Sequence, residues 1–120
     1  MTGRIESTFQ RLRQANKKAL IAYLMAGDPS LAETERLVLE IEQAGADIIE
    51  LGVAFSDPIA DGPVIQLAAE RGLRSGTSLR KILAMMKTLR SRTQVPIVLM
   101  VYYNSIHAMG IETFCRTAGE

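Results

Sequence analysis

The sequence predicts an α/β fold in which parallel strands alternate with helices. Short, continuously apolar runs of strand length recur at residues 19–26, 46–51 and 95–102, and longer amphipathic segments separate them. Runs that are apolar at nearly every position are typical of parallel strands covered on both faces. Strands and helices alternating in this order favour right-handed crossovers. Periodicity alone leaves two architectures open, an open doubly wound sheet and part of an eight-stranded barrel.

The first strand–helix unit is marked by its turn and by its helix signals. Gly27-Asp28-Pro29 ends the first apolar run. Ser30 with Glu33 three residues later has the form of a capping box, which predicts a helix start. Apolar residues then recur at helical spacing until Gly45, which offers a C-terminal cap. These signals predict a strand, a tight turn and a helix in succession.

Two helices are predicted between the second and third strands. Pro63 suits the first turn of a short helix that carries Ile65–Arg71 and ends at Gly72. A second helix begins near Ser78, with apolar residues at three- and four-residue spacing and basic residues on the opposite face. The crossover between these two strands is therefore expected to contain both helices.

The ends of the chain carry weaker signals. Pro96 opens the third apolar run, at a position where a strand tolerates a missing N–H, and a last helix is expected over residues 110–118. The polar N-terminal segment is interpreted as a solvated face because of its basic cluster, which consists of Arg11, Arg13, Lys17 and Lys18.

Composition narrows the function classes. The chain has 120 residues, 48% of them hydrophobic and 22% charged, which is ordinary for a globular protein with a single core. A net charge of +1 gives no electrostatic reason to expect nucleic acid or an anionic membrane as a partner. The single cysteine, Cys115, excludes an internal disulfide and leaves no thiol set for a metal. Without a membrane-length apolar run or a secretory signal, the expected compartment is the cytoplasm.

Two carboxylates, one at the C-terminal end of the second strand and one in the loop after it, have no structural role that the strand requires. Glu50 closes the apolar run, and Asp61 lies in the Pro- and Gly-marked loop that follows. Ligands of parallel α/β proteins bind at the C-terminal ends of the strands. Tyr23, Met100 and Tyr102 end the neighbouring strands, so we expect an aromatic-lined pocket with an acid in it.

The environments of the two carboxylates suggest different roles. Between Ile49 and Leu51, Glu50 would lose hydration, which favours its protonated form and would let it give and take a proton near neutral pH. Asp61, on a loop, stays ionised more easily, and such pairs often divide acid and base roles. Structural alternatives remain open for both residues: Glu50 as a helix-pairing or solvent-facing strand end, and Asp61 as a helix cap before Gly62-Pro63.

A family resemblance extends this interpretation. The segment Ile49–Gly62, continued by Pro63 and Ile65-Gln66, resembles the signature of the tryptophan synthase alpha subunit family. Almost the whole chain can be placed on the family's N-terminal half, with further similarity at Leu24–Pro29, Ala44–Asp47 and Pro96–Asn104. The resemblance implies a (β/α)8 TIM barrel, of which residues 1–120 supply roughly the first three β/α units as the N-terminal part of a single domain. Ala54 stands where many members have Pro, which is expected to loosen its loop.

The resemblance also implies a reaction and its residues. Family members are lyases of tryptophan biosynthesis that cleave indole-3-glycerol phosphate to indole and glyceraldehyde 3-phosphate by a retro-aldol reaction. Glu50 matches the family's acid–base residue, and Asp61 matches the carboxylate that faces the indole N–H and stabilises positive charge on the ring. Tyr23, Met100 and Tyr102 fall where family members line the indole pocket.

A partner is implied in the same way. Residues matching the mobile loop that meets the family's beta subunit are Phe55, Ser56, Asp57 and Pro58, and Asn104 lies near the same side. The assembled family enzyme is a heterotetramer. Pyridoxal phosphate is expected only in the partner beta subunit, so neither a cofactor nor a metal is expected in this chain.

Length limits what the chain is expected to do alone. A barrel of eight units takes about 250 residues, and the family's phosphate-binding residues lie in the absent half. We therefore expect the 120-residue chain by itself to be inactive or nearly so. Three parallel strands would leave two edges and the inner face uncovered, which predicts self-association. The alternatives are another phosphate-binding barrel enzyme and a truncated, non-catalytic barrel fragment that acts only as a folding or self-association unit.

Overall fold

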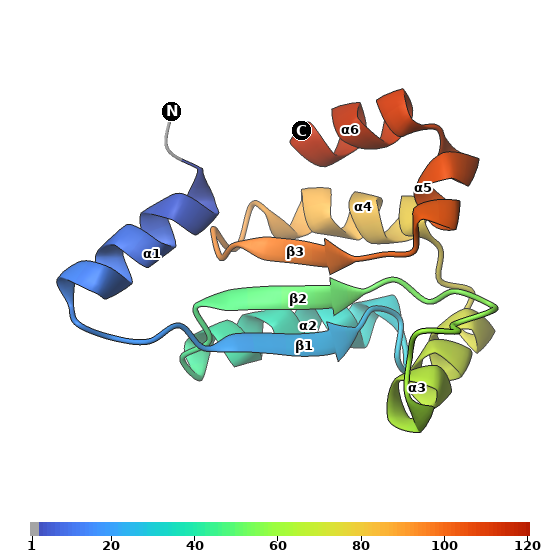
Figure 1. Ribbon diagram of the computed structural model, residues 1–120, viewed down its shortest axis with the longest axis horizontal. Coiled ribbons are helices and arrows are strands. Elements are labelled where there is room, and N and C mark those ends of the chain that lie inside the picture. The colour runs from blue at the N-terminus through green and yellow to red at the C-terminus, as the bar shows by residue number, and fades with distance from the viewer. Residues whose placement is uncertain (1–2) are drawn as a thin grey trace.

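The computed structural model describes residues 3–120, and within them three strands alternate with six helices (Figure 1). The elements in chain order are α1 (Arg4–Gln14), β1 (Ile21–Met25), α2 (Leu31–Gln43), β2 (Ile48–Gly52), α3 (Pro63–Arg74), α4 (Leu79–Leu89), β3 (Ile97–Met100), α5 (Tyr103–Met109) and α6 (Ile111–Gly119). The predicted α/β class is confirmed. None of the helices in this described part of the chain has the length and apolar character needed to cross a membrane.

The strands form one parallel sheet in the order β1-β2-β3. Tyr23 of β1 pairs with Glu50 of β2, and Glu50 pairs with Val98 of β3, so these three residues share one face. In Figure 1 all strands point the same way, with α1 beyond their N-terminal ends and α3 and α5 beyond their C-terminal ends. Strands β1 and β3 are the open edges of this sheet.

The hydrophobic core lies between the sheet and helices α2 and α4. Ile49 and Leu51 point from β2 into this core and have no accessible surface, and they cluster with Val38 of α2 and Ile82 of α4. The opposite face of the sheet is more open: Ile21 and Val98 lie on it and are 50% and 38% exposed. The apolar runs predict coverage of both faces. Within residues 3–120, helices α2 and α4 cover one face, whereas the opposite face is covered only in part, where Ile48 is buried and Met25 packs against Ala68 and Ala69 of α3.

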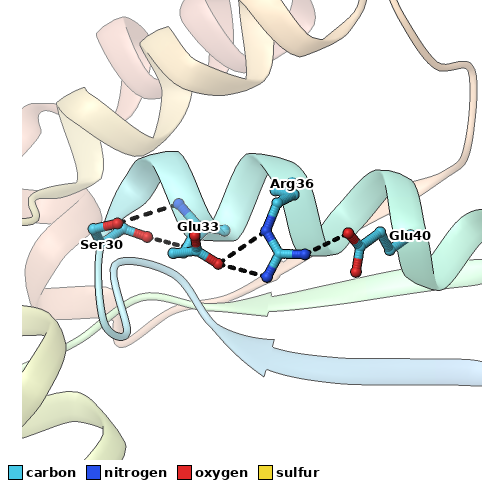
Figure 2. A network of polar contacts seen from close by, with 5 residues as sticks. Ser30, Glu33, Arg36 and Glu40 are labelled. Atoms are coloured by element: carbon cyan, nitrogen blue, oxygen red, sulfur yellow. Dashed lines mark hydrogen bonds and ion pairs between the residues drawn. The ribbon is translucent and has the colours of Figure 1, made fainter.

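The predicted helix start is confirmed, with Ser30 as the N-cap residue of α2, but only the Ser30 half of the capping box is formed, because the Glu33 carboxylate pairs with Arg36 (Figure 2). The backbone N–H of Glu33 donates to Ser30 Oγ at 3.2 Å. Arg36 then bridges Glu33, at 2.7 Å, and Glu40 along the exposed side of the helix. Gly45 follows the helix with a φ of 112°, a backbone conformation that glycine adopts at low steric cost because it has no Cβ atom.

Two helices are present that the sequence reading did not predict. The N-terminal segment folds as α1, which buries Leu12, while its basic residues remain exposed as expected: Arg11, Arg13, Lys17 and Lys18. Residues after β3 form α5, which is separated from α6 by Gly110 at a φ of 93°. The amphipathic spacing of Ile5, Phe9 and Leu12 is the signal that indicates α1.

The predicted end of α3 at Gly72 is wrong, because the helix continues to Arg74. Gly72 is buried where the helix meets the first strand–helix turn. A Cβ atom at Gly72 would lie 3.2 Å from the backbone oxygen of Ala26 and 3.5 Å from Cβ of Ala54. This glycine therefore permits close packing of α3 and does not cap it.

Candidate active site

Glu50 lies in the middle of β2, as the third of its five residues, and not at the strand end that the sequence indicates. The strand extends through Gly52 because Gly52 still pairs with Met25 and Met100. The sequence neighbours of Glu50 point to the helix-covered face, so they do not enclose its carboxylate, which is partly exposed on the open face. The predicted loss of hydration between Ile49 and Leu51 is therefore incomplete.

A cavity of about 360 Å³ opens at the C-terminal edge of the sheet. Its lining brings together residues of β1 and β3 and of the segments that follow β2 and β3: Tyr23, Met25, Val53, Ala60, Asp61, Met100, Val101 and Tyr102. The structure thus places Tyr23, Met100, Tyr102 and Asp61 around one space of a size usual for small ligands. Asp61 is the acid in this lining, whereas Glu50 lies on the same face deeper along β2.

The Asp61 carboxylate is held by Tyr102. The Tyr102 hydroxyl donates to Asp61 Oδ2 at 3.2 Å. The Tyr102 hydroxyl oxygen also accepts a hydrogen bond from the backbone N–H of Ala60 at 3.1 Å. Phe55 stacks on the Tyr102 ring with 5.1 Å between centroids. The alternative of Asp61 as a helix cap is wrong, because Gly62 is the N-cap residue of α3 and no side chain caps it.

Gln66 is a positioning residue to which sequence reasoning gave no role. It lies in the first turns of α3, and its Nε2 donates to the backbone oxygen of Asp61 at 2.8 Å. This hydrogen bond joins α3 to the loop that precedes it, so α3 fixes the backbone of Asp61. Tyr102 orients the carboxylate of Asp61. The sequence signal that could have indicated a role for Gln66 is its place in the signature segment. The contact itself depends on the conformation of the loop.

Tyr23 extends its phenol along the open face from β1 onto Gly52 of β2. A Cβ atom at Gly52 would lie 2.1 Å from Tyr23 Oη, so only glycine leaves room for the ring. Among residues 3–120, the Tyr23 hydroxyl is buried without any hydrogen-bond partner. Burial raises the pKa of Tyr23 above its ordinary 10.0, and the negative charges of Asp61 and then Glu50 raise it further, so the phenol keeps its proton at neutral pH.

The turn after β1 is tied to α3 and so supports the loop that carries Asp61. Arg71 donates two hydrogen bonds to Asp28, from Nε to Oδ1 and from Nη2 to Oδ2, each at 2.8 Å. These hydrogen bonds, together with the charge of Arg71, hold the pKa of Asp28 below its ordinary 3.8. Gly27 completes the turn by donating its N–H to Thr34 Oγ1 at 2.9 Å.

A second hollow, of about 390 Å³, lies on the outer side of the same loop. Phe55 and Ser56 line it from the loop, and Ser105 and Ala108 line it from α5. Asn104 is exposed on α5 beside this hollow and does not line the pocket that contains Asp61. Ser56 and Asp57 are also exposed and joined by a hydrogen bond of 2.8 Å, so the predicted partner-facing residues of the loop and α5 lie on neighbouring surfaces.

The pocket lining is aromatic, apolar and acidic. No lysine, arginine or histidine contributes to it. Across residues 3–120, no three His, Cys, Asp or Glu side chains gather in a way that could hold a metal ion. The chemistry available at this site is therefore stacking on aromatic rings, apolar contact and proton transfer by carboxylates.

A parallel sheet with its helices outside and a pocket at the C-terminal strand edge defines a protein of the α/β-barrel class. A family model described as tryptophan synthase alpha chain matches residues 9–120, and the chain belongs to that family. It is 56% identical over 116 residues to the tryptophan synthase alpha chain of Geotalea daltonii, an alignment that covers 97% of this chain and 44% of the relative. The corresponding protein of Citrifermentans bemidjiense is 56% identical over 118 residues, which cover 98% and 44% of the two chains.

Solved structures of the family confirm the barrel fold. The crystal structure of tryptophan synthase subunit alpha from Legionella pneumophila aligns with a TM-score of 0.96 at 38% identity, over 99% of this chain and 46% of that one. The aminoacrylate-bound tryptophan synthase from M. tuberculosis aligns with a TM-score of 0.89 at 35% identity, over 98% and 47%. The chain thus has the fold of part of a (β/α)8 TIM barrel and spans less than half the length of the relatives it matches.

Proposed function

We propose that this chain carries the acid–base part of the active site of a tryptophan synthase alpha-type lyase, which cleaves indole-3-glycerol phosphate to indole and glyceraldehyde 3-phosphate. The observation that carries the proposal is the placement of Glu50 and Asp61 on one open sheet face and its edge, beside an aromatic pocket of about 360 Å³. Membership of the family supports the same reaction.

In this proposal Glu50 is the proton-transfer group. A retro-aldol cleavage requires a proton on indole C3 and removal of the proton from the side-chain hydroxyl. The bond between C3 and the glycerol carbon then breaks, its electrons return to the ring, and the hydroxyl-bearing carbon becomes an aldehyde. Glu50 suits both transfers because it is partly exposed on the face over which the substrate would lie.

Asp61 is proposed to stabilise the charge that protonation creates. Protonation at C3 leaves positive charge on the ring nitrogen, and a carboxylate facing that N–H lowers the energy of the cation. The hydrogen bond from Tyr102 fixes the direction of the Asp61 carboxylate before the substrate binds. Such preorganisation matters because a group already in place does not have to reorganise during the reaction.

The pocket walls suit a flat apolar ring. Tyr23, Met100 and Tyr102 offer two aromatic rings and a polarisable thioether around the cavity. Its lining holds no cation for a phosphate group. We therefore assign only the indole end of the substrate to residues 1–120 and propose that the phosphate is bound by parts of the barrel for which these residues supply no counterpart.

The outer hollow is proposed to face a tryptophan synthase beta subunit. Phe55 and Ser56 line this hollow, Asp57 and Pro58 follow them in the loop, and Asn104 precedes Ser105 of its lining. In the proposed heterotetramer, pyridoxal phosphate belongs to the beta subunit and this chain holds no cofactor. We place the complex in the cytoplasm, in keeping with the free, exposed Cys115.

A second candidate function is favoured by one specific observation. The open sheet face exposes Ile21 and Val98, and both sheet edges are unpaired. Such a surface pairs readily with further strands. On this alternative, the 120-residue chain is a non-catalytic folding or self-association unit.

The proposed reaction is tested in a complete barrel. In a chimeric barrel, residues 1–120 of this chain are joined to the remaining part of the Geotalea daltonii alpha chain, and indole release from indole-3-glycerol phosphate is measured. We expect Glu50→Gln to lower kcat by about 100-fold or more, because general acid–base groups contribute factors of this size. The matched control is Glu112→Gln on exposed α6, with no expected effect.

Three results would contradict the proposal. Unchanged turnover in the Glu50→Gln chimeric barrel would exclude Glu50 as the proton-transfer group. Turnover by the 120-residue chain alone would show that the phosphate end of the site does not require other parts of a barrel. Absence of turnover in the unsubstituted chimeric barrel would favour the non-catalytic alternative.

A further inference from the structure

The Tyr23 hydroxyl is the starting point, because burial without a partner is costly for a polar group. Within residues 3–120 it is buried and makes no hydrogen bond, although the rest of its ring lines the pocket. An unpaired buried hydroxyl destabilises a fold and calls for a specific explanation. The energetically cheaper residue of the same shape is phenylalanine, which packs the ring and omits the oxygen.

The Glu50 carboxylate is the complementary group. It accepts no hydrogen bond from the residues that the structure describes, and it lies directly beside Tyr23 in the sheet register, on the same face. The Tyr23 ring runs over Gly52, two residues beyond Glu50, in the direction in which strand side chains lean. An unpaired donor and an unpaired acceptor thus occupy neighbouring positions on two paired strands.

Substrate binding would bring the two groups together. Glu50 lies beside the open pocket and is partly exposed, so water can reach it and it has no need of a protein donor. A substrate that displaces this water removes its hydrogen bonds to Glu50, and the Tyr23 hydroxyl is an unpaired donor on the adjacent strand and the same sheet face. The raised pKa of Tyr23 keeps the phenol protonated, so it is able to donate.

We propose that Tyr23 is a positioning residue whose hydroxyl donates a hydrogen bond to the Glu50 carboxylate when substrate fills the pocket, fixing that carboxylate for proton transfer. The proposal rests on the lyase function and adds a role that pocket lining alone does not give. Gly52 is part of the arrangement, because any side chain at that position would displace the phenol. The ring of Tyr23 thus forms part of the pocket wall, and its hydroxyl orients the Glu50 carboxylate.

The test is Tyr23→Phe in the chimeric barrel, which removes the oxygen and keeps the ring. We expect kcat to fall about 10- to 100-fold, the effect of losing a hydrogen bond to a charged group, with KM changed by no more than about twofold. The urea midpoint without substrate should stay equal or rise, because an unpaired buried hydroxyl has been removed. The control is Tyr103→Phe, because Tyr103 is exposed on α5 and its ring lies 5.9 Å from that of His107 in a tilted arrangement.

Each other outcome overturns the proposal. An increase in KM at unchanged kcat would mean that Tyr23 is only part of the pocket wall. A lower urea midpoint would mean that the hydroxyl is paired in the resting protein. If Tyr23→Phe has normal kinetics while the unsubstituted chimeric barrel cleaves its substrate, this proposal fails and the lyase function stands, whereas an inactive unsubstituted barrel removes both.

Discussion

Replacing Gly52 by alanine tests the close packing on which the pocket floor depends. The added Cβ would lie 2.1 Å from Oη and 2.8 Å from Cζ of Tyr23, and 3.1 Å from Sδ of Met25. The first two separations are too short for any side chain pair, so the phenol has to rotate. The thioether contact is milder, because the flexible end of Met25 moves at little cost.

The expected net effect combines two terms of opposite sign. Overpacking against the phenol costs about 1–3 kcal/mol. Replacing a strand glycine by alanine recovers roughly 0.5–1 kcal/mol of backbone entropy. Gly52→Ala should therefore lower the free energy of unfolding by about 1–2 kcal/mol, measured by urea denaturation of the chimeric barrel. Gly119→Ala is the control, since an added Cβ there has no neighbour within 4 Å.

Repeating Gly52→Ala in a barrel that already carries Tyr23→Ala tests whether the Tyr23 ring causes the loss of stability. In a Tyr23→Ala barrel the phenol is gone, so Gly52→Ala should change from destabilising to neutral or slightly stabilising. The coupling energy of this double-mutant cycle should be about 2 kcal/mol. Equal costs of Gly52→Ala in both backgrounds would refute the argument, because the loss of stability would then not arise from the Tyr23 ring.

Two further predictions concern the turn after β1 and the open sheet. In the chimeric barrel, Arg71→Gln should lower the urea midpoint modestly at pH 7, since Arg71 is about half exposed. Arg71 lowers the pKa of Asp28, so the stability that the pair contributes is full above pH 3.8 and is lost as the pH falls through the folded-state pKa of Asp28. The urea midpoints of the unsubstituted and Arg71→Gln barrels should therefore converge in acid. A difference between these midpoints that does not change with pH would contradict this cause. The 120-residue chain alone should elute from size-exclusion chromatography as an associated species, because Ile21 and Val98 are exposed beside open edges, and a compact monomer would count against that reasoning.

The strands and helices α2 and α4 were predictable because each repeats one physical pattern along the chain. The buried residues of α4, for example, follow the three-four spacing from Leu79 to Leu89. Helix α5 lacks such a pattern, since Tyr103–His107 consists of residues with modest helix propensity. The helix is supported by packing of Ile106 and Met109 against the core, and this contact with distant elements is invisible to local propensity.

The strand position of Glu50 shows a second limit of sequence reasoning. Its neighbours Ile49 and Leu51 indicate burial only if all three side chains share one environment, but a strand sends successive side chains to opposite faces. The residues that surround Glu50 in space are therefore its register partners Tyr23 and Val98, from other strands. A residue in a sheet has to be interpreted through its cross-strand neighbours, which depend on the register.

The support of Asp61 extends this reasoning from the strand to the loop. Tyr102 stands 41 residues away in the chain, and its oxygen both accepts the Ala60 N–H and donates to the Asp61 carboxylate. Phenylalanine at this position would keep the stacking with Phe55 and lose both hydrogen bonds, so the requirement for tyrosine arises from the loop. The loop packs on Tyr102 through Phe55 and bonds to it through Ala60 and Asp61. The position of the carboxylate therefore depends on the segment between β3 and α5 as much as on its own segment. Aromatic residues that pattern analysis assigns to a pocket wall thus also determine where the acids of the site lie.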